Sequence, residues 1–164
     1  MRVMALAAAL ILAGCSEPAA EKAEEKKADA LQPGAYELTM AVTALDSTDK
    51  STPATKAKVG PASVLPERVC VAAEGLPTTA FAEAGDTCTP LDSYMRGGRM
   101  SLQFRCNRGG RGMLTHTIDG TFKADSFDAR IVTGTVFAAD GDYQMSRTLT
   151  GRRVGDCPPA EAAQ

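Results

Sequence analysis

The stretch that decides the fold runs from residue 100 to residue 151 and reads MSLQFRCNRGGRGMLTHTIDGTFKADSFDARIVTGTVFAADGDYQMSRTLTG. Apolar and polar residues alternate in it along four runs, and turns rich in glycine, asparagine and aspartate separate the runs. Alternation with a period of two is typical of a strand that buries one face. The stretch therefore predicts four consecutive strands of an antiparallel up-and-down meander.

Pairing the four runs about their turns predicts which side chains lie opposite one another. Phe122 is expected opposite Phe127, and Phe137 opposite Tyr143. The same registers place one apolar residue of each strand in a row across the sheet. This row consists of Leu102, Ile118, Ile131 and Leu149. Such rows stabilise a sheet, and a slip of one residue would turn each apolar set to water.

The neighbouring row on the same apolar face would contain Phe104, His116, Thr133 and Arg147. In one interpretation, His116 is a core histidine bonded to a hydroxyl, and Arg147 extends to water at a sheet edge. In the other, these side chains form a polar spot inside a concave apolar face that suits an anionic ligand. His116, Thr133 and Arg147 are then candidate ligand-binding residues, which requires His116 and Arg147 on one face.

The chain before this meander adds further strands. From Pro33 onward, Tyr36, Leu38, Met40 and Val42 alternate with polar residues. The other expected elements are a polar exposed loop at 46–63, a strand at 64–73, a short helix or loop at 74–86, and a strand at 88–95. The expected fold class is all-β, an antiparallel up-and-down meander of about seven strands forming an open or closed barrel or a sandwich.

The amino-terminal residues have the form of a bacterial lipoprotein signal. Arg2 precedes a short apolar run that ends in Leu12-Ala13-Gly14-Cys15, which matches the charged, apolar and small-residue regions of a secretory signal. The run is much shorter than the roughly 20 residues of a spanning helix. We expect removal of residues 1–14 and acylation of Cys15. Ser16, in place of aspartate, favours an outer-membrane anchor with the domain in the periplasm.

The composition divides the rest of the chain into three parts. Residues 15–32 are highly charged and contain few large apolar side chains, and such a segment cannot bury enough surface to fold. We expect it to be a flexible tether after the lipidated cysteine. Residues 33–158 fit a single β domain, and residues 159–164 are expected to be a disordered tail.

The four remaining cysteines are Cys70, Cys88, Cys106 and Cys157. An even number in an exported chain predicts two disulfides. Cys88 and Cys106 are equidistant from Gly97, the middle of a glycine turn, so a hairpin there would place them opposite each other. This predicts Cys88 with Cys106 and Cys70 with Cys157. The pairing of Cys70 with Cys88 and of Cys106 with Cys157 stays open as an alternative.

Metal, cofactor and enzyme motifs are not found in the sequence. The cysteine gaps contain no close Cys-x-x-Cys pair, and the chain has one histidine, so a zinc site is not expected. No nucleophile elbow, metalloprotease, P-loop or dinucleotide motif occurs. We therefore expect a protein that is not an enzyme and that binds no cofactor or metal.

The charge of the chain argues against a nucleic-acid partner. The formal net charge is −2, whereas nucleic-acid binding usually needs a strongly basic surface. The run Arg108-Gly109-Gly110-Arg111-Gly112 is similar to the RGG segments of RNA-binding proteins. A single copy inside a hairpin is better interpreted as turn glycines with solvated arginines.

Several stretches give the chain a resemblance to a known family. They are Pro33-Gly34-Ala35-Tyr36-Glu37, the cysteines at 70, 88 and 106, and Gly151-Arg152-Arg153-Val154-Gly155-Asp156-Cys157. Over residues 33–157 the chain resembles the proteobacterial lipoproteins of domain of unknown function 3617. The closing stretch is the most specific of these pieces. The resemblance implies a small exported domain with no assigned catalytic residue.

These observations predict an envelope lipoprotein that is anchored in the membrane and monomeric. The leading hypothesis is a β domain that acts as a binding module for an envelope protein or a small amphipathic ligand. The alternative is a structural or accessory protein that acts through its outer surface without a ligand pocket. An apolar cavity would favour ligand binding, whereas a filled interior with an exposed apolar patch would favour a partner protein.

Overall fold

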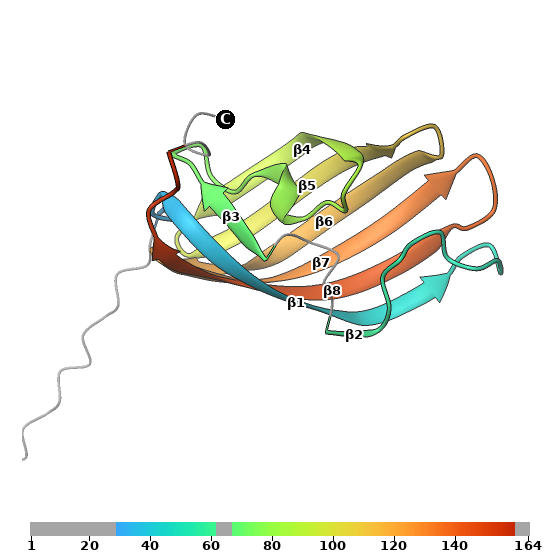
Figure 1. Cartoon of the computed structure of the whole chain (residues 1–164), viewed down its shortest axis with the longest axis horizontal. Helices are drawn as coiled ribbons and strands as arrows, with labels where there is room; N and C mark the ends of the chain where they lie inside the picture. The colour runs from blue at the N-terminus through green and yellow to red at the C-terminus, as the bar shows by residue number, and fades with distance from the viewer. Residues whose placement is uncertain (1–28, 62–66, 160–164) are drawn as a thin grey trace, which may run out of the picture.

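The computed structural model describes residues 29–61 and 67–159. These residues form one eight-stranded antiparallel sheet, which confirms the all-β meander (Figure 1). Within the described ranges, the helical structure is one 3₁₀ turn, η1 (Thr78–Ala80). No helix among the described residues is long and apolar enough to cross a membrane.

Six of the eight strands have 10 to 14 residues, whereas β2 and β3 have two and four. Their bounds are β1 Gly34–Ser47, β2 Gly60–Pro61, β3 Arg68–Val71, β4 Asp86–Arg96, β5 Arg99–Arg108, β6 Gly112–Lys123, β7 Ser126–Phe137 and β8 Tyr143–Gly155. The order in the sheet is β2-β1-β8-β7-β6-β5-β4. Strand β3 lies outside this order and, like β2, pairs with β1. The sheet has eight strands instead of the expected seven because two residues of the predicted loop form the additional strand β2.

The sheet is curved and open. Strands β4 to β8 follow one another as the meander, and β1 pairs along the outer side of β8. In the described part of the chain, no pairing joins β4 to β2 or β3, so the sheet does not close into a barrel through backbone pairing. Figure 1 shows the segment between β3 and β4 lying against one face of the curved sheet.

The registers between β5, β6 and β7 agree with the prediction. Phe122 is paired with Phe127, and Ile118 lies between Leu102 and Ile131. The predicted register between β7 and β8 is wrong by two residues, because Ala129 is the partner of Leu149. The predicted rows therefore break at β8.

The cause of this shift lies in the turn between β7 and β8. The Asp142 carboxylate accepts hydrogen bonds from the Phe137 N–H and from the Thr135 hydroxyl, both at 2.9 Å. The Tyr143 N–H donates to Thr135 Oγ1 at 2.8 Å, which holds Tyr143 beside Thr135 instead of opposite Phe137. A shift of two residues keeps each side chain on its predicted face.

The hairpin between β4 and β5 places Cys88 opposite Cys106, as predicted. Its turn consists of Gly97 and Gly98, both with positive φ, which suits a two-residue hairpin turn. In a regular hairpin, a turn centred between these glycines would pair Cys88 with the residue that follows Cys106. A bulge between Pro90 and Asp92 shifts the register by one residue and restores the cysteine pair.

The core lies on the concave face of the sheet. It contains inward side chains of nearly every strand together with Ala80 and Phe81, from the segment between β3 and β4. Without tryptophan, the largest buried apolar side chains are Tyr36, Tyr143, Phe81 and Phe127. These side chains pack against one another on the concave face of the sheet.

The ends of the domain differ slightly from the prediction. Leu31 is buried, and the Gln32 N–H donates to the Ala124 carbonyl at 2.7 Å, so folded structure begins before Pro33. The predicted signal peptide at 1–14, Cys15, the tether as far as residue 28, and the tail from residue 160 lie outside the described residues. The predicted strand at 64–73 is observed only as β3, and residues 62–66 are not among those described.

Candidate functional site

The structure brings His116, Thr133 and Arg147 together on the concave face. They lie on the adjacent strands β6, β7 and β8, and all three side chains are buried. Arg147 is fully buried, so it does not extend to water at a sheet edge as the first interpretation supposed. They are the buried polar or charged residues of the described chain. The strand alternation therefore gathers its polar side chains at one point of an apolar face.

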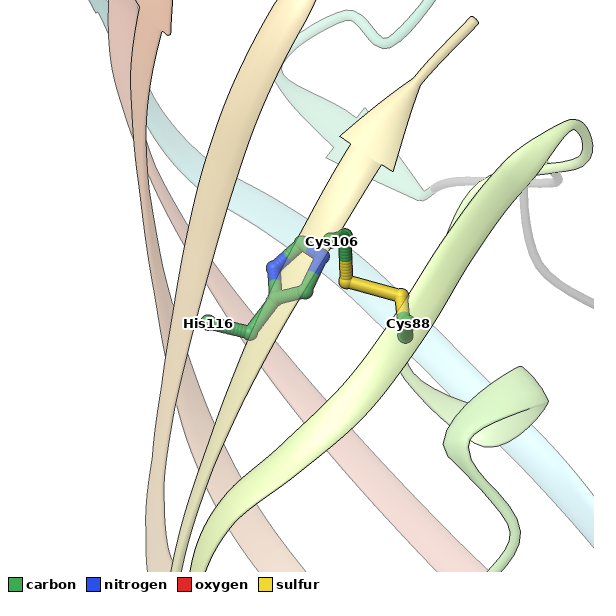
Figure 2. Close-up of side chains that lie close together, drawn as sticks. All are labelled: Cys88, Cys106 and His116. Atoms are coloured by element: carbon green, nitrogen blue, oxygen red, sulfur yellow. A yellow bond between two sulfur atoms is a disulfide. The ribbon is translucent and has the colours of Figure 1, made fainter.

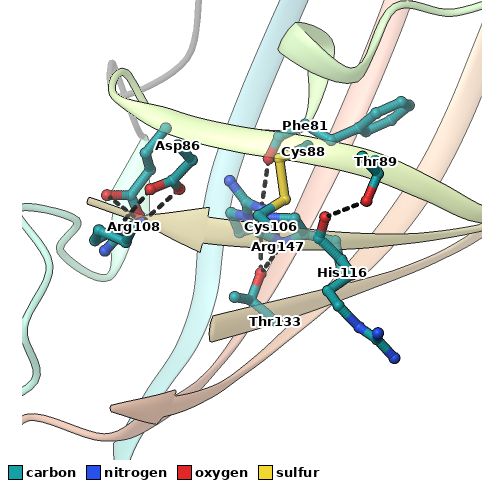
Figure 3. Close-up of a disulfide and its surroundings, with 11 residues drawn as sticks. Phe81, Asp86, Cys88, Thr89, Cys106, Arg108, His116, Thr133 and Arg147 are labelled. Atoms are coloured by element: carbon teal, nitrogen blue, oxygen red, sulfur yellow. Dashed lines mark hydrogen bonds and ion pairs between the residues drawn. A yellow bond between two sulfur atoms is a disulfide. The ribbon is translucent and has the colours of Figure 1, made fainter. Parts of the chain in front are cut away.

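A chain of hydrogen bonds connects the three residues. Arg147 Nη2 donates to Thr133 Oγ1 at 3.2 Å, and His116 Nδ1 lies 2.8 Å from the same oxygen (Figure 3). A guanidinium only donates hydrogen bonds, so the Thr133 oxygen accepts from Arg147. Arg147 Nη2 also lies 3.4 Å from His116 Nδ1, and Nδ1 accepts from it when the ring proton is on Nε2. The Thr133 hydroxyl then donates to Nδ1. His116 is thus bonded to a hydroxyl, as the first interpretation expected, and its ring proton is on Nε2.

Arg147 reaches beyond the sheet to the segment between β3 and β4. Its Nη2 donates to the Phe81 carbonyl at 2.9 Å, and its Nη1 contacts Met40 Sδ at 3.8 Å. In the described ranges, Arg147 Nε is buried and has no hydrogen-bond partner. All the partners of this buried guanidinium are uncharged.

We name residues 72–85 the cover segment. Its Ala80, Phe81 and Ala82 are buried, and the Phe81 ring stacks on Phe104 of β5 with centroids 5.4 Å apart. The prediction of a short helix or loop at 74–86 did not anticipate this burial. The available signal was Phe81 itself, the one large aromatic side chain in that polar stretch.

Arg108 holds the end of the cover segment. Its Nε and Nη2 donate to the two Asp86 carboxylate oxygens at 2.7 and 2.8 Å, and Nη2 pairs with Glu83 at 3.2 Å (Figure 3). Nη1 donates to the Ala54 carbonyl and to the Tyr143 hydroxyl. The Asp86 side chain is 0% exposed. The expectation of a solvated turn arginine is therefore wrong for Arg108, although Arg111 is exposed.

The charges of the site are set by burial. Burial, followed by the nearby Arg147 charge, lowers the pKa of His116 from 6.5 to about 4. Burial also lowers the pKa of Arg147, while the carboxylates of Glu83 and Asp86 act in the opposite direction. Both carboxylates contact Arg108. At neutral pH the site therefore consists of a neutral imidazole beside one buried cation.

We expect His116 to make the stability of the domain depend on pH. The unfolded state binds a proton near pH 6.5 and the folded state near pH 4, so stability is full above the first value and falls as the pH drops toward the second. Between pH 7 and pH 5 the loss is about 2 kcal/mol. Urea unfolding at both pH values should show this loss in the wild type and not in His116→Gln. Equal pH dependence of the two proteins would contradict the assignment.

His116 also lies beside a disulfide. Its ring and the sulfurs of Cys88 and Cys106 have ligand atoms within 4.8 Å of one another, the one such potential metal-binding group among the described residues. Figure 2 shows one ring nitrogen directed toward the disulfide. Metal binding to cysteine needs thiolates. The sulfurs of Cys88 and Cys106 are bonded to each other, so in this state they supply no thiolate ligand.

The two disulfides follow the first of the predicted pairings. Cys88 is bonded to Cys106, and Cys70 is bonded to Cys157. The alternative pairing is therefore wrong. Cys15 lies outside the described residues.

The two motif stretches at the ends of the domain lie side by side. The start of β1 pairs with the end of β8 and with β3, and the Arg153 guanidinium donates to the Pro33 carbonyl at 3.0 Å and to Asp156. Cys70 lies opposite Ala35 in β1 and is bonded to Cys157. These stretches therefore join the first and last strands, at a distance from Arg147.

Comparison with known proteins gives one match. The family model for the protein of unknown function DUF3617 matches residues 31–157. No curated protein and no solved structure matches the chain. The matched residues include the whole sheet and both disulfides. The chain belongs to the DUF3617 family.

Proposed function

We propose that this protein is a lipoprotein of the bacterial envelope whose β domain binds a small amphipathic ligand. Acylation of Cys15 would anchor it in the outer membrane, and the monomeric domain would face the periplasm. The signal pattern before Cys15 supports the anchor. The two disulfides fit an oxidising compartment. We propose a binding role, not an enzymatic one.

The observation that carries this proposal is the buried Arg147 guanidinium. Burial of a charge without an opposite charge is unfavourable, and each hydrogen-bond partner of Arg147 is neutral. The surrounding face is apolar. An anionic group on Arg147 with an apolar part against the sheet would satisfy both features, once the cover segment gives way. His116 and Thr133 would complete the polar end of this site.

A second candidate function has its own support. The convex face carries the neighbouring apolar side chains of Met113 and Val136, which are 49% and 67% exposed. This pair suits an accessory protein that contacts an envelope partner through its outer surface. Replacement of both residues by serine would weaken such a contact and leave ligand binding unchanged.

The anchor is tested by Cys15→Ser expressed in a Gram-negative host. The wild type should incorporate labelled palmitate and fractionate with the outer membrane, because acyl chains at the amino terminus hold a protein firmly in a bilayer. The variant should lose the label and at least nine-tenths of its membrane fraction. Equal membrane association of both proteins would refute the anchor.

The binding role is tested by native mass spectrometry of the full chain carrying Cys15→Ser, purified without detergent from the periplasm. A bound small molecule should accompany a fraction of the protein, and organic extraction should release it. Arg147→Met should reduce this fraction at least tenfold, whereas Arg152→Met, which removes an exposed arginine, should leave it unchanged. The same bound fraction in all three proteins would exclude Arg147 from the site.

A further inference from the structure

We propose that the ligand of this site is a long-chain monocarboxylate and that Phe81 occupies its place in the closed protein. The Phe81 carbonyl takes the position of the ligand carboxylate on Arg147, and the Phe81 ring takes part of the position of the acyl chain. This inference rests on the proposed binding function and makes the ligand class specific.

Arg147 accounts for the carboxylate. The Phe81 carbonyl offers one oxygen, which accepts from Nη2, and Nε is left buried without a partner in the described part of the chain. A carboxylate has two oxygens and commonly accepts from two guanidinium nitrogens at once. It would also supply the negative charge that the carbonyl lacks. Exchange of the carbonyl for a carboxylate thus improves both hydrogen bonding and charge balance at Arg147.

The rest of the site limits the ligand to one charge. His116 is neutral at neutral pH, and Thr133 already accepts from Arg147 and donates to His116. The other inward cation among the described residues, Arg108, is already paired with Asp86 and Glu83. A doubly charged phosphate would therefore bring a charge that this site does not balance, which is unfavourable away from water.

The apolar surroundings account for the chain. The Phe81 ring lies against Phe104, and both belong to one continuous apolar cluster that extends across the concave face. The buried polar residues that Phe81 adjoins through Arg147 are His116, Thr133 and Arg147 itself. A head group with several hydroxyls or amides would lack partners there, whereas an acyl chain needs none.

The cover segment has features that allow it to move away. Its buried part is short and consists of Ala80, Phe81 and Ala82. Gly75 and Gly85 stand on either side of these residues with φ of 109° and 93°, in a region where glycine is readily accommodated. Outside this part, Arg108 holds Glu83 and Asp86. Phe81 can therefore leave the core by rotation at the two glycines, which releases Glu83 while the Arg108–Asp86 pair, beyond Gly85, persists.

The test uses the full chain carrying Cys15→Ser and measures binding of dodecanoate, dodecanol and dodecyl phosphate below their micelle concentrations by titration calorimetry. Dodecanoate should bind at least tenfold tighter than either other compound. Phe81→Ala, which removes the competing ring, should bind dodecanoate at least tenfold tighter than the parent chain. Arg147→Met should bind dodecanoate and dodecanol equally, and Arg152→Met should behave as the parent.

The outcomes separate this inference from the proposed function. Equal binding of dodecanoate and dodecanol, or tighter binding of dodecyl phosphate, would overturn the carboxylate assignment and leave an amphipathic ligand in place. Absence of binding by all three compounds, including to Phe81→Ala, would overturn both proposals. Unchanged or weaker dodecanoate binding by Phe81→Ala would refute the role of Phe81 as a competitor. If Arg147→Met does not fold, the comparison of compounds in the parent and in Phe81→Ala still decides.

Discussion

Replacement of Cys70 and Cys157 by serine should lower the free energy of unfolding by about 4 to 5 kcal/mol. The disulfide joins β3 to the chain just after β8 across a sequence separation of 87 residues. A bond that closes so long a loop removes much conformational entropy from the unfolded chain. It also holds β3 against the edge of β1. The double variant should therefore show the largest loss of stability among the disulfide variants.

Guanidinium chloride unfolding followed by circular dichroism measures this effect in a chain that has no tryptophan. The matched control is the double serine variant of Cys88 and Cys106. That pair closes a loop with a separation of 18 residues, so its removal should lower the free energy of unfolding by about 3 kcal/mol. A larger loss in the control than in the Cys70 and Cys157 variant would contradict the ranking.

Arg108→Met should lower the free energy of unfolding by about 3 kcal/mol or more. Arg108 binds both carboxylate oxygens of Asp86, whose side chain is fully buried, and pairs with Glu83. Removal of the guanidinium leaves the buried Asp86 carboxylate without its counter-ion. An unpaired buried charge destabilises the folded state. Urea unfolding at pH 7 measures the loss.

Arg105→Met is the matched control, because Arg105 lies on the same strand with an exposed side chain. Its replacement should change the free energy of unfolding by no more than about 0.5 kcal/mol. Addition of Asp86→Asn to Arg108→Met should recover part of the lost stability, since the neutral amide carries no charge to balance. Equal losses in Arg105→Met and Arg108→Met would show that the ion pairs with Asp86 and Glu83 do not stabilise the fold.

The position of Arg108 could have been predicted from the sequence. Met100, Leu102, Phe104 and Cys106 alternate inward along β5, and Arg108 continues the same parity. The glycines that follow it indicate a turn, and a side chain in a turn is expected to be exposed to solvent. In the folded protein, Glu83 of the cover segment and Asp86 of β4 neutralise the charge of Arg108. The alternation of residues along β5 does not predict these two partners.

The shared face of His116, Thr133 and Arg147 was predictable for a different reason. Strand alternation determines the face of each side chain, and the observed shift of two residues between β7 and β8 leaves the face unchanged. The partner across the strand pair does depend on the register. The Asp142 and Thr135 side chains set that register through their turn contacts, which the alternation of apolar residues does not encode.

The sequence by itself determined the antiparallel meander, the hairpin between β4 and β5, and the face on which Arg147 lies. These features follow from the two-residue period of strands and from short turns, so neighbouring residues suffice to specify them. Only the tertiary structure decided that Phe81 covers Arg147 and that Arg108 holds the cover segment. Residues 72–85 have no regular period, and their position results from contacts with strands that are remote along the chain.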